Sequence, residues 1–173
     1  MSYDSRPDTY DHIRQVQIRM HRAIVWLMKS SMEHDQTKLE GIELETFDEF
    51  TPRLWGMTYG SDEYKKCIED MAPALRHHYE HNSHHPEYYA AGIRGMSLMD
   101  LIEMVCDWSA ATMRHANGEI LQSIEINQKR FGYSDELKQI LINTAHDLWM
   151  TASDASAHQC ARRAKCGEEH SDE

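Results

Sequence analysis

The chain has 173 residues, 40% of them hydrophobic, and 29 acidic against 18 basic residues give it a formal net charge of −11. Such a length supports a single domain with a real core, since a chain of this size buries roughly 70% of the surface that its unfolded form exposes. The negative charge argues against a general nucleic-acid binder. Because no apolar run approaches the roughly 20 residues of a membrane span and the N-terminus does not resemble a signal peptide, we expect a cytoplasmic protein.

The first half of the chain has the apolar spacing of helices. From Asp11 to Met32, apolar residues recur every three or four positions, the period of an amphipathic helix. The segment Leu39 to Trp55 predicts one short helix that stops near Pro52, followed by an irregular aromatic stretch. Ser61 precedes acidic residues and is typical of a helix N-cap, and Pro73 is expected to kink or divide the helix that follows.

The second half continues this pattern. Ser97 is expected to open a long helix that Asn117-Gly118 closes, and Ser134 opens another that runs toward a polar tail. No β-alternation of useful length is present. We therefore expect an all-α fold, a single-domain compact bundle of five to seven helices over residues 1–165, with a flexible tail over 166–173.

Some histidines and carboxylates are candidates for metal ligands. His34 and Asp35 follow the first predicted helix, and Lys38 comes three residues after the aspartate. An isolated His-Asp pair is weak evidence, because chance produces many. His12 near the start of that helix and Asp107 in the fourth predicted helix would add to them the imidazole and carboxylate ligands that a divalent ion prefers.

Asp107 has two interpretations. On a helical wheel it shares a face with Asp100 and Glu103, opposite the apolar residues, which favours a solvated position. The apolar arc of this helix is broad, however, and a carboxylate set in it could point into a cavity.

Five histidines lie close together between residues 77 and 85, namely His77, His78, His81, His84 and His85. Asn82-Ser83 and Pro86 indicate that a helix ends within this stretch. A run of surface histidines is the simplest interpretation. The functional alternatives are a second metal site, or imidazoles that bind phosphate and donate protons near pH 7.

These motifs resemble a known superfamily. His12, "HD" at 34 and 35, "HH" at 77 and 78, and Asp107 follow the order of the H…HD…D signature of the HD phosphohydrolases, and "HDQTK" resembles their HD-x-x-K form. "HHYEHNSHHPEYY" and "MSLMDLIEMVCDW" are similar to a family of short bacterial and phage proteins to which no established activity attaches. The resemblance covers nearly the whole chain.

The superfamily resemblance implies an HD-type helical bundle and a divalent ion held by His12, His34, Asp35 and Asp107. His21 is an alternative first ligand. We prefer His12, because the 22 residues that separate it from His34 are closer to the usual separation in the superfamily. The ion could be Mn, Co, Mg, Fe or Zn.

The implied activity is a phosphohydrolase for a nucleotide or related small phosphate ester, in which a metal-activated water attacks phosphorus. Asp35, Lys38 and His78 are the expected catalytic residues. The expected substrate-binding residues are Arg76, His77, His84 and His85. The expected partner is a small phosphorylated substrate, with neither nucleic acid nor a membrane, and a homo-oligomer is compatible with the sequence. The alternatives are an HD-fold di-iron oxygenase and a non-catalytic nucleotide-binding protein.

Overall fold

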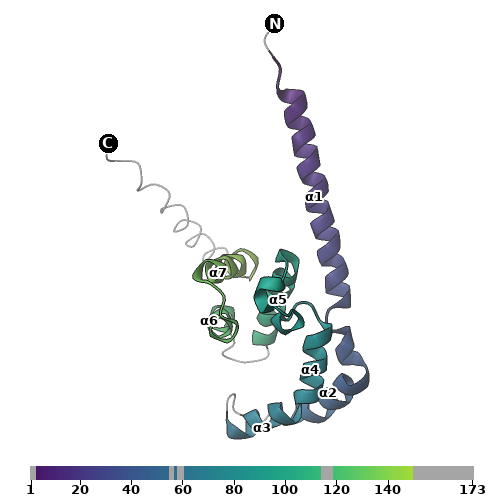
Figure 1. Ribbon diagram of the computed structural model, residues 1–173, viewed down its shortest axis with the longest axis vertical. Helices are drawn as coiled ribbons and strands as arrows, with labels where there is room; N and C mark the ends of the chain where they lie inside the picture. Colours follow the sequence, from purple (N-terminus) through teal and green to yellow (C-terminus); the bar gives the residue numbers. More distant parts are fainter. Residues whose placement is uncertain (1–2, 55–56, 58–60, 114–118, 150–173) are drawn as a thin grey trace, which may run out of the picture. The chain divides into compact units, whose positions relative to one another are not determined.

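The computed structural model describes residues 3–54, 57, 61–113 and 119–149, and all regular elements in these ranges are helices (Figure 1). The all-α prediction is therefore confirmed. The α-helices and 3₁₀ helices (η) are α1 (Arg6–Glu33), η1 (Gln36–Leu39), α2 (Gly41–Leu54), α3 (Asp62–Asp70), α4 (Ala72–His81), η2 (Pro86–Tyr88), η3 (Gly92–Gly95), α5 (Leu98–Thr112), α6 (Ile120–Phe131) and α7 (Asp135–Trp149). None of the described helices is both long and apolar enough to cross a membrane.

Local sequence signals account for most of these boundaries. The Ser61 hydroxyl accepts a hydrogen bond from the backbone N–H of Tyr64 at 3.1 Å, as an N-cap should. Pro73 lies in the first turn of α4, and the chain is divided between α3 and α4 at Met71. α2 runs past the expected stop at Pro52 and ends at Leu54. Pro52 therefore lies in the last turn of the helix, and only two helical residues follow it.

Other expected features are corrected or lie elsewhere. The segment that forms α6 carries no expected element. Trp55, the Asn117-Gly118 helix end and the tail 166–173 lie outside the described residues. The chain splits into two compact units, Met1–Met104 and Val105–Glu173, which are described separately below. The single domain expected over residues 1–165 stays a prediction.

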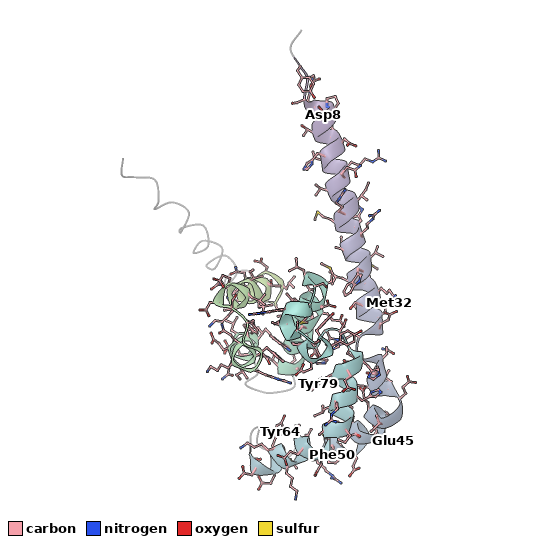
Figure 2. The ribbon with its side chains drawn as sticks, viewed as in Figure 1. Asp8, Met32, Glu45, Phe50, Tyr64 and Tyr79 are labelled. Carbon is pink, nitrogen blue, oxygen red and sulfur yellow. The ribbon has the colours of Figure 1, made fainter. Side chains whose placement is uncertain are left out.

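The first unit holds α1 to α4 and the start of α5. α2 packs against η1 and α4 (Figure 1), and Cys67 of α3, Met71 and Ala74 of α4 are buried. α1 has no buried residue, and its N-terminal part, where Asp8 lies, extends away from α2, α3 and α4 (Figure 2). The expectation that the first long helix joins a compact bundle is therefore wrong for most of its length within this unit.

The second unit is built from the end of α5 with α6 and α7. Ile124, Leu141 and Ala145 are buried in it, and the Tyr133 hydroxyl donates a hydrogen bond to the backbone oxygen of Ile124 at 2.6 Å. Burial raises the pKa of Tyr133 above its ordinary value, so this donor stays protonated. Gly132 ends α6 with φ at +64°, in the left-handed region that favours glycine.

The Gly132 turn allows a simple test of backbone strain. Nothing lies within 4 Å of a Cβ built at this position, so Gly132→Ala should destabilise the protein through its backbone alone, by about 1 kcal/mol. Gly132→Asn should cost less, because asparagine tolerates the left-handed region. Urea unfolding followed by far-UV circular dichroism measures both, and equal losses for the two variants would contradict this explanation.

Candidate metal centre

Asp35 is held in a left-handed turn between α1 and η1. Its φ of +56° is the one positive value for a non-glycine residue in the described ranges. Such a conformation is uncommon, although aspartate adopts it more readily than most residues, and it is often found at functional sites. Lys38 stabilises the turn, since its backbone N–H donates to the Asp35 backbone oxygen at 2.9 Å and its Nζ donates to Oδ2 at 2.6 Å. This arrangement leaves Oδ1 free to face another group.

His78 on α4 and Glu43 on α2 form a buried pair. The relative exposure of His78 is 2% and that of Glu43 is 0%. Nδ1 of His78 lies 2.9 Å from Oε2 of Glu43, and since a carboxylate only accepts, Nδ1 carries the proton. The lone pair of His78 is therefore on Nε2, on the other side of the ring.

A tight turn after α4 brings two more histidines back toward His78. Asn82 ends the helix, and its side-chain Nδ2 donates to the His78 backbone oxygen at 2.8 Å. The backbone N–H of His85 then donates to the Asn82 oxygen at 3.1 Å, and Pro86 begins η2. The expected helix end at Asn82-Ser83 is confirmed. Its consequence is that His84 and His85 approach His78 from outside α4.

Four of these side chains present ligand atoms to one another: Asp35, His78, His84 and His85, whose atoms all lie within 4.8 Å. Asp35 Oδ1 lies 3.4 Å from His78 Nε2 and 3.5 Å from His84 Nε2. His85 Nε2 lies 2.9 Å from His78 Nε2. Donors about 2.1 Å from one ion lie about 3.4 Å apart in a tetrahedron and about 3.0 Å apart when adjacent in an octahedron. The observed spacings fit a single divalent ion.

Glu103 on α5 supports the cluster from a second side. Its Oε1 accepts hydrogen bonds from His34 Nδ1 at 2.9 Å and from His84 Nδ1 at 3.1 Å, and Ser30 donates to its Oε2. The proton of His84 is thereby fixed on Nδ1, which puts the lone pair of the ring on Nε2. A carboxylate behind each of two ligand histidines is the usual way in which proteins orient imidazole ligands and raise their basicity.

The cluster is charged as a metal site requires. Burial alone would raise the pKa of Asp35 and Glu103, but the hydrogen bond and positive charge of Lys38 at the former, and hydrogen bonds from His34, His84 and Ser30 to the latter, hold both pKa values well below the ordinary range. Burial lowers the pKa of His78 and lowers that of His85 to about 2, with His84 and His78 adding to the effect on His85. At neutral pH the carboxylates are ionised and these two histidines are neutral, the form that binds metal.

One atom in the cluster has an unmet requirement. Oδ1 of Asp35 is buried and has no hydrogen-bond partner among the described residues. A buried carboxylate oxygen without a partner is costly, and a cation in contact with it removes the cost. The donor set and this atom both fit a bound divalent ion.

Two cavities in the first unit lie beside the cluster. One, of about 320 Å³, is lined by Trp26, Lys29, Ser30, Glu33, His81, Asn82, Ser83, His84 and Glu103. The other, of about 300 Å³, is lined by Thr37, Glu40, Gly41, Ile42 and His77. The first reaches the candidate ligand His84, and the second reaches Thr37 and His77, which both hydrogen-bond to Glu43.

Three of the expected site residues are not brought to this cluster. α1 is continuous from Arg6 to Glu33, so the 22 residues from His12 to His34 span about 33 Å, and His12 is exposed. The expectation that His12 is a ligand beside His34 is therefore wrong within one chain. His21, about 20 Å from His34 by the same rule, fails as the alternative. Arg76 is exposed and lies two residues from His78, on nearly the opposite side of α4.

Asp35 keeps its expected part as a candidate ligand, and His34, also expected as a ligand, forms a second candidate metal-holding group with His84 and Glu103. Other expected residues have different parts. His84 and His85, expected to bind substrate, and His78, expected to donate a proton, lie with Asp35 as candidate ligands. His34 binds Glu103, and its Nε2 is 3.6 Å from Asp35 Oδ2. His77 binds Oε1 of Glu43 at 2.7 Å and is 43% exposed. Asp107 belongs to the second unit, so this site is described without it.

Sequence reasoning missed Glu43 and Glu103. Glu43 is one of several acidic residues in α2, and no spacing distinguishes it from the others. Glu103 was assigned to a solvated face of its helix, yet its side chain is only 12% exposed. Asp100 on the same face is buried and accepts a hydrogen bond from Ser83 at 3.0 Å. A polar stripe on an otherwise apolar helix was the available signal.

Comparisons with known proteins identify a family. A family model described as "Family of unknown function (DUF5662)" matches residues 1–147. No curated protein and no solved structure matches the chain.

Metal binding is the direct test of this site. We expect the purified protein to bind about one divalent ion per chain at the four-residue cluster and His85→Ala to lose most of that binding. Glu43→Gln should keep the ligands but weaken affinity by about 10- to 100-fold, because it removes the carboxylate behind His78. His81→Ala is the matched control, since His81 is exposed and donates to a backbone oxygen. Titration calorimetry with elemental analysis measures all four proteins, and equal loss in the control would contradict the assignment.

The depressed histidine pKa values predict a dependence of stability on pH. In the metal-free protein the folded pKa values of His78 and His85 lie below the ordinary value of 6.5. Above pH 6.5 neither state takes up a proton there, whereas below it the unfolded state protonates first. The free energy of unfolding should therefore fall as pH falls from 6.5 toward 4, by up to about 1.4 kcal/mol per pH unit for each group. Urea unfolding with chelator present measures this slope, which should flatten in His85→Gln.

Proposed function

Since the chain belongs to the family of unknown function DUF5662, its chemistry has to be read from the site, and we propose that it is a divalent-metal-dependent phosphohydrolase acting on a nucleotide or related small phosphate ester. The observation that supports this proposal is the convergence of Asp35 Oδ1 with the Nε2 atoms of His78 and His84, each histidine with a carboxylate behind it. The resemblance of "HDQTK" to the HD-x-x-K motif adds the reaction class.

The charge of the site supports a divalent ion and an anionic substrate. With the histidines neutral, Asp35, Glu43 and Glu103 contribute −3 and Lys38 contributes +1, which sums to −2. A divalent ion neutralises this sum. The site is then neutral, although the formal net charge of the protein is −11, so a phosphate is no longer repelled by the carboxylates at the site itself.

Each residue has a defined task in this proposal. When bound, the ion would polarise a phosphoryl oxygen and lower the pKa of a water. Asp35 holds its Oδ1 toward the cluster because Lys38 holds Oδ2. Lys38, with its side chain 31% exposed, is also a cation beside the cluster that a phosphate oxygen can reach. Glu43 and Glu103 keep the ligand histidines in one tautomer and orientation.

A second function is favoured by one observation. The cluster offers four protein donors, three imidazoles and one carboxylate. Four protein donors fill a tetrahedral zinc site, as in structural sites, whereas catalytic zinc sites keep one position open. The chain would then be a non-catalytic protein whose metal stabilises the turn after α4. An ion that accepts five or six ligands, such as Mn²⁺ or Fe²⁺, would retain open positions with the same residues.

The proposal is tested by measuring hydrolysis and metal content on the same samples, with Mn²⁺, Co²⁺, Mg²⁺, Fe²⁺ and Zn²⁺ against a nucleotide panel. Asp35→Ala should lose metal and activity together. Lys38→Ala should keep the metal and lose rate by about 10²- to 10³-fold, since it removes one positive charge beside the phosphate. Lys65→Ala, which removes an exposed lysine on α3, is the control and should keep full activity.

Three results would contradict the phosphohydrolase. The first is a metal-loaded wild-type protein that hydrolyses nothing on the panel, which favours the closed structural site. The second is full activity in Asp35→Ala. The third is turnover that requires O₂ and iron, which would favour an oxygenase.

A further inference from the structure

The loop over residues 82–97, which contains two of the candidate metal ligands, is anchored to the first turn of α5. Both ends of the loop meet at the side chain of Asp100, which is only 5% exposed. Its Oδ1 accepts a hydrogen bond from the Ser83 hydroxyl at 3.0 Å. Its Oδ2 accepts from the hydroxyl of Ser97 at 2.6 Å and from the backbone N–H of the same residue at 2.8 Å. One carboxylate therefore closes the loop from both sides.

The bonds to Ser97 have an ordinary structural explanation. Ser97 directly precedes α5, and Asp100 is the third residue of that helix. The backbone N–H of Asp100 donates to the Ser97 hydroxyl at 3.3 Å, and the Ser97 N–H donates in return to the carboxylate. This reciprocal pair is a capping box, which needs only one carboxylate oxygen. It accounts for Oδ2 but gives no reason for the bond between Ser83 and Oδ1.

Ser83 directly precedes His84, and α5 holds both residues. The Ser83 hydroxyl donates to Asp100, and Nδ1 of His84 donates to Oε1 of Glu103 at 3.1 Å. Asp100 and Glu103 are three residues apart, so they lie on the same face of α5 with their Cβ atoms about 5 to 6 Å apart. A bond to the His84 ring alone would let the backbone pivot about Glu103. The second bond, from the preceding residue, prevents this movement.

The carboxylate of Asp100 is well suited to hold its partners firmly. The Tyr89 hydroxyl also bonds to it, and burial together with this bond raises the pKa of Tyr89 to about 12, so the hydroxyl stays protonated. Burial alone would raise the pKa of Asp100, but the bonds from the two serines and from Tyr89 hold it below the ordinary value. Asp100 is therefore ionised at neutral pH. Hydrogen bonds to an ionised acceptor are about twice as strong as those between neutral groups.

We propose that Asp100 is a positioning residue of the candidate metal centre, which acts through Ser83 to set His84 for the ion. This inference rests on metal binding at the four-residue cluster, on which the proposed function also depends, but not on hydrolysis. Nε2 of His84 lies 3.5 Å from Oδ1 of Asp35, a separation that suits two ligands of one ion. The side chains of such a site have to be held within about 0.5 Å of the binding geometry.

Two serine variants separate the two roles of Asp100. Ser83→Ala removes the anchor and keeps the capping box, and the Tyr89 hydroxyl still bonds to the buried carboxylate. Ser97→Ala is the matched control, because it removes the hydroxyl of the cap and keeps the bond from Ser83. A purely structural role of Asp100 predicts that neither variant changes metal affinity. A positioning role predicts that only Ser83→Ala does.

The probe is Co²⁺ alone, titrated by calorimetry and by its visible absorption, which reports ligand geometry. Ser83→Ala should weaken binding about tenfold, at the low end of the effect of residues that orient metal ligands, and should alter the absorption bands. Ser83→Thr keeps the hydroxyl and should restore most of the affinity. Ser97→Ala should lower the urea midpoint of the metal-free protein and change the affinity by less than about twofold.

A double-variant cycle tests whether Asp100 acts through Ser83. Asp100→Ala should weaken Co²⁺ binding at least as much as Ser83→Ala, and the two changes together should weaken it no further than Asp100→Ala alone. Losses that multiply would overturn the proposal. Circular dichroism checks the fold of each variant, and the serine variants decide the question even where Asp100→Ala does not fold.

The outcomes distinguish this proposal from the proposed function. Wild-type affinity in Ser83→Ala would overturn the positioning role and leave the phosphohydrolase standing. Equal weakening by Ser83→Ala and Ser97→Ala would do the same, because it would trace the effect to the stability of the helix end. A wild-type protein that binds no divalent ion would overturn both.

Discussion

The buried carboxylate of Glu43 is the contact on which the first unit depends. It accepts hydrogen bonds from Thr37, His77 and His78, so one side chain of α2 joins η1 to α4. A fully buried carboxylate without such donors would be strongly destabilising. The same bonds fix the proton of His78 on Nδ1 and turn its Nε2 toward Asp35 and His85. Packing of the unit and orientation of the cluster therefore have a common physical cause.

The features that the sequence predicted correctly are local ones. The cap at Ser61, the division before Pro73 and the helix end at Asn82 each depend on a few neighbouring residues. The roles of Glu43 and Glu103 could not be predicted from the sequence, because a carboxylate becomes a partner of a histidine only when tertiary contacts bring the two together. His84 and His85 were identified as functional, but their ligand arrangement depends on the path of the turn after α4.

The assignment of His12 shows a conflict within the sequence itself. The apolar spacing from Asp11 to Met32 predicts one continuous helix, and such a helix already separates His12 from His34 by about 33 Å. The order of motifs in the superfamily suggested proximity that this spacing does not allow within one chain. The structure keeps the helix unbroken from Arg6 to Glu33. Geometric consistency between elements is therefore a stronger criterion than motif order.

Because Asp35 lies immediately beyond α1, the orientation of this long helix is linked to the geometry of the candidate metal site. His34 is the C-cap of α1, and Asp35 is the next residue, in a turn with φ at +56°. A rigid helix of 28 residues is about 42 Å long, so a tilt of a few degrees at its C-terminal end displaces its N-terminal end by several ångströms. If an ion binds at Asp35, a restraint on α1 that changes the geometry of this turn changes the affinity for the ion, and by thermodynamic reciprocity the ion changes the strength of the restraint equally.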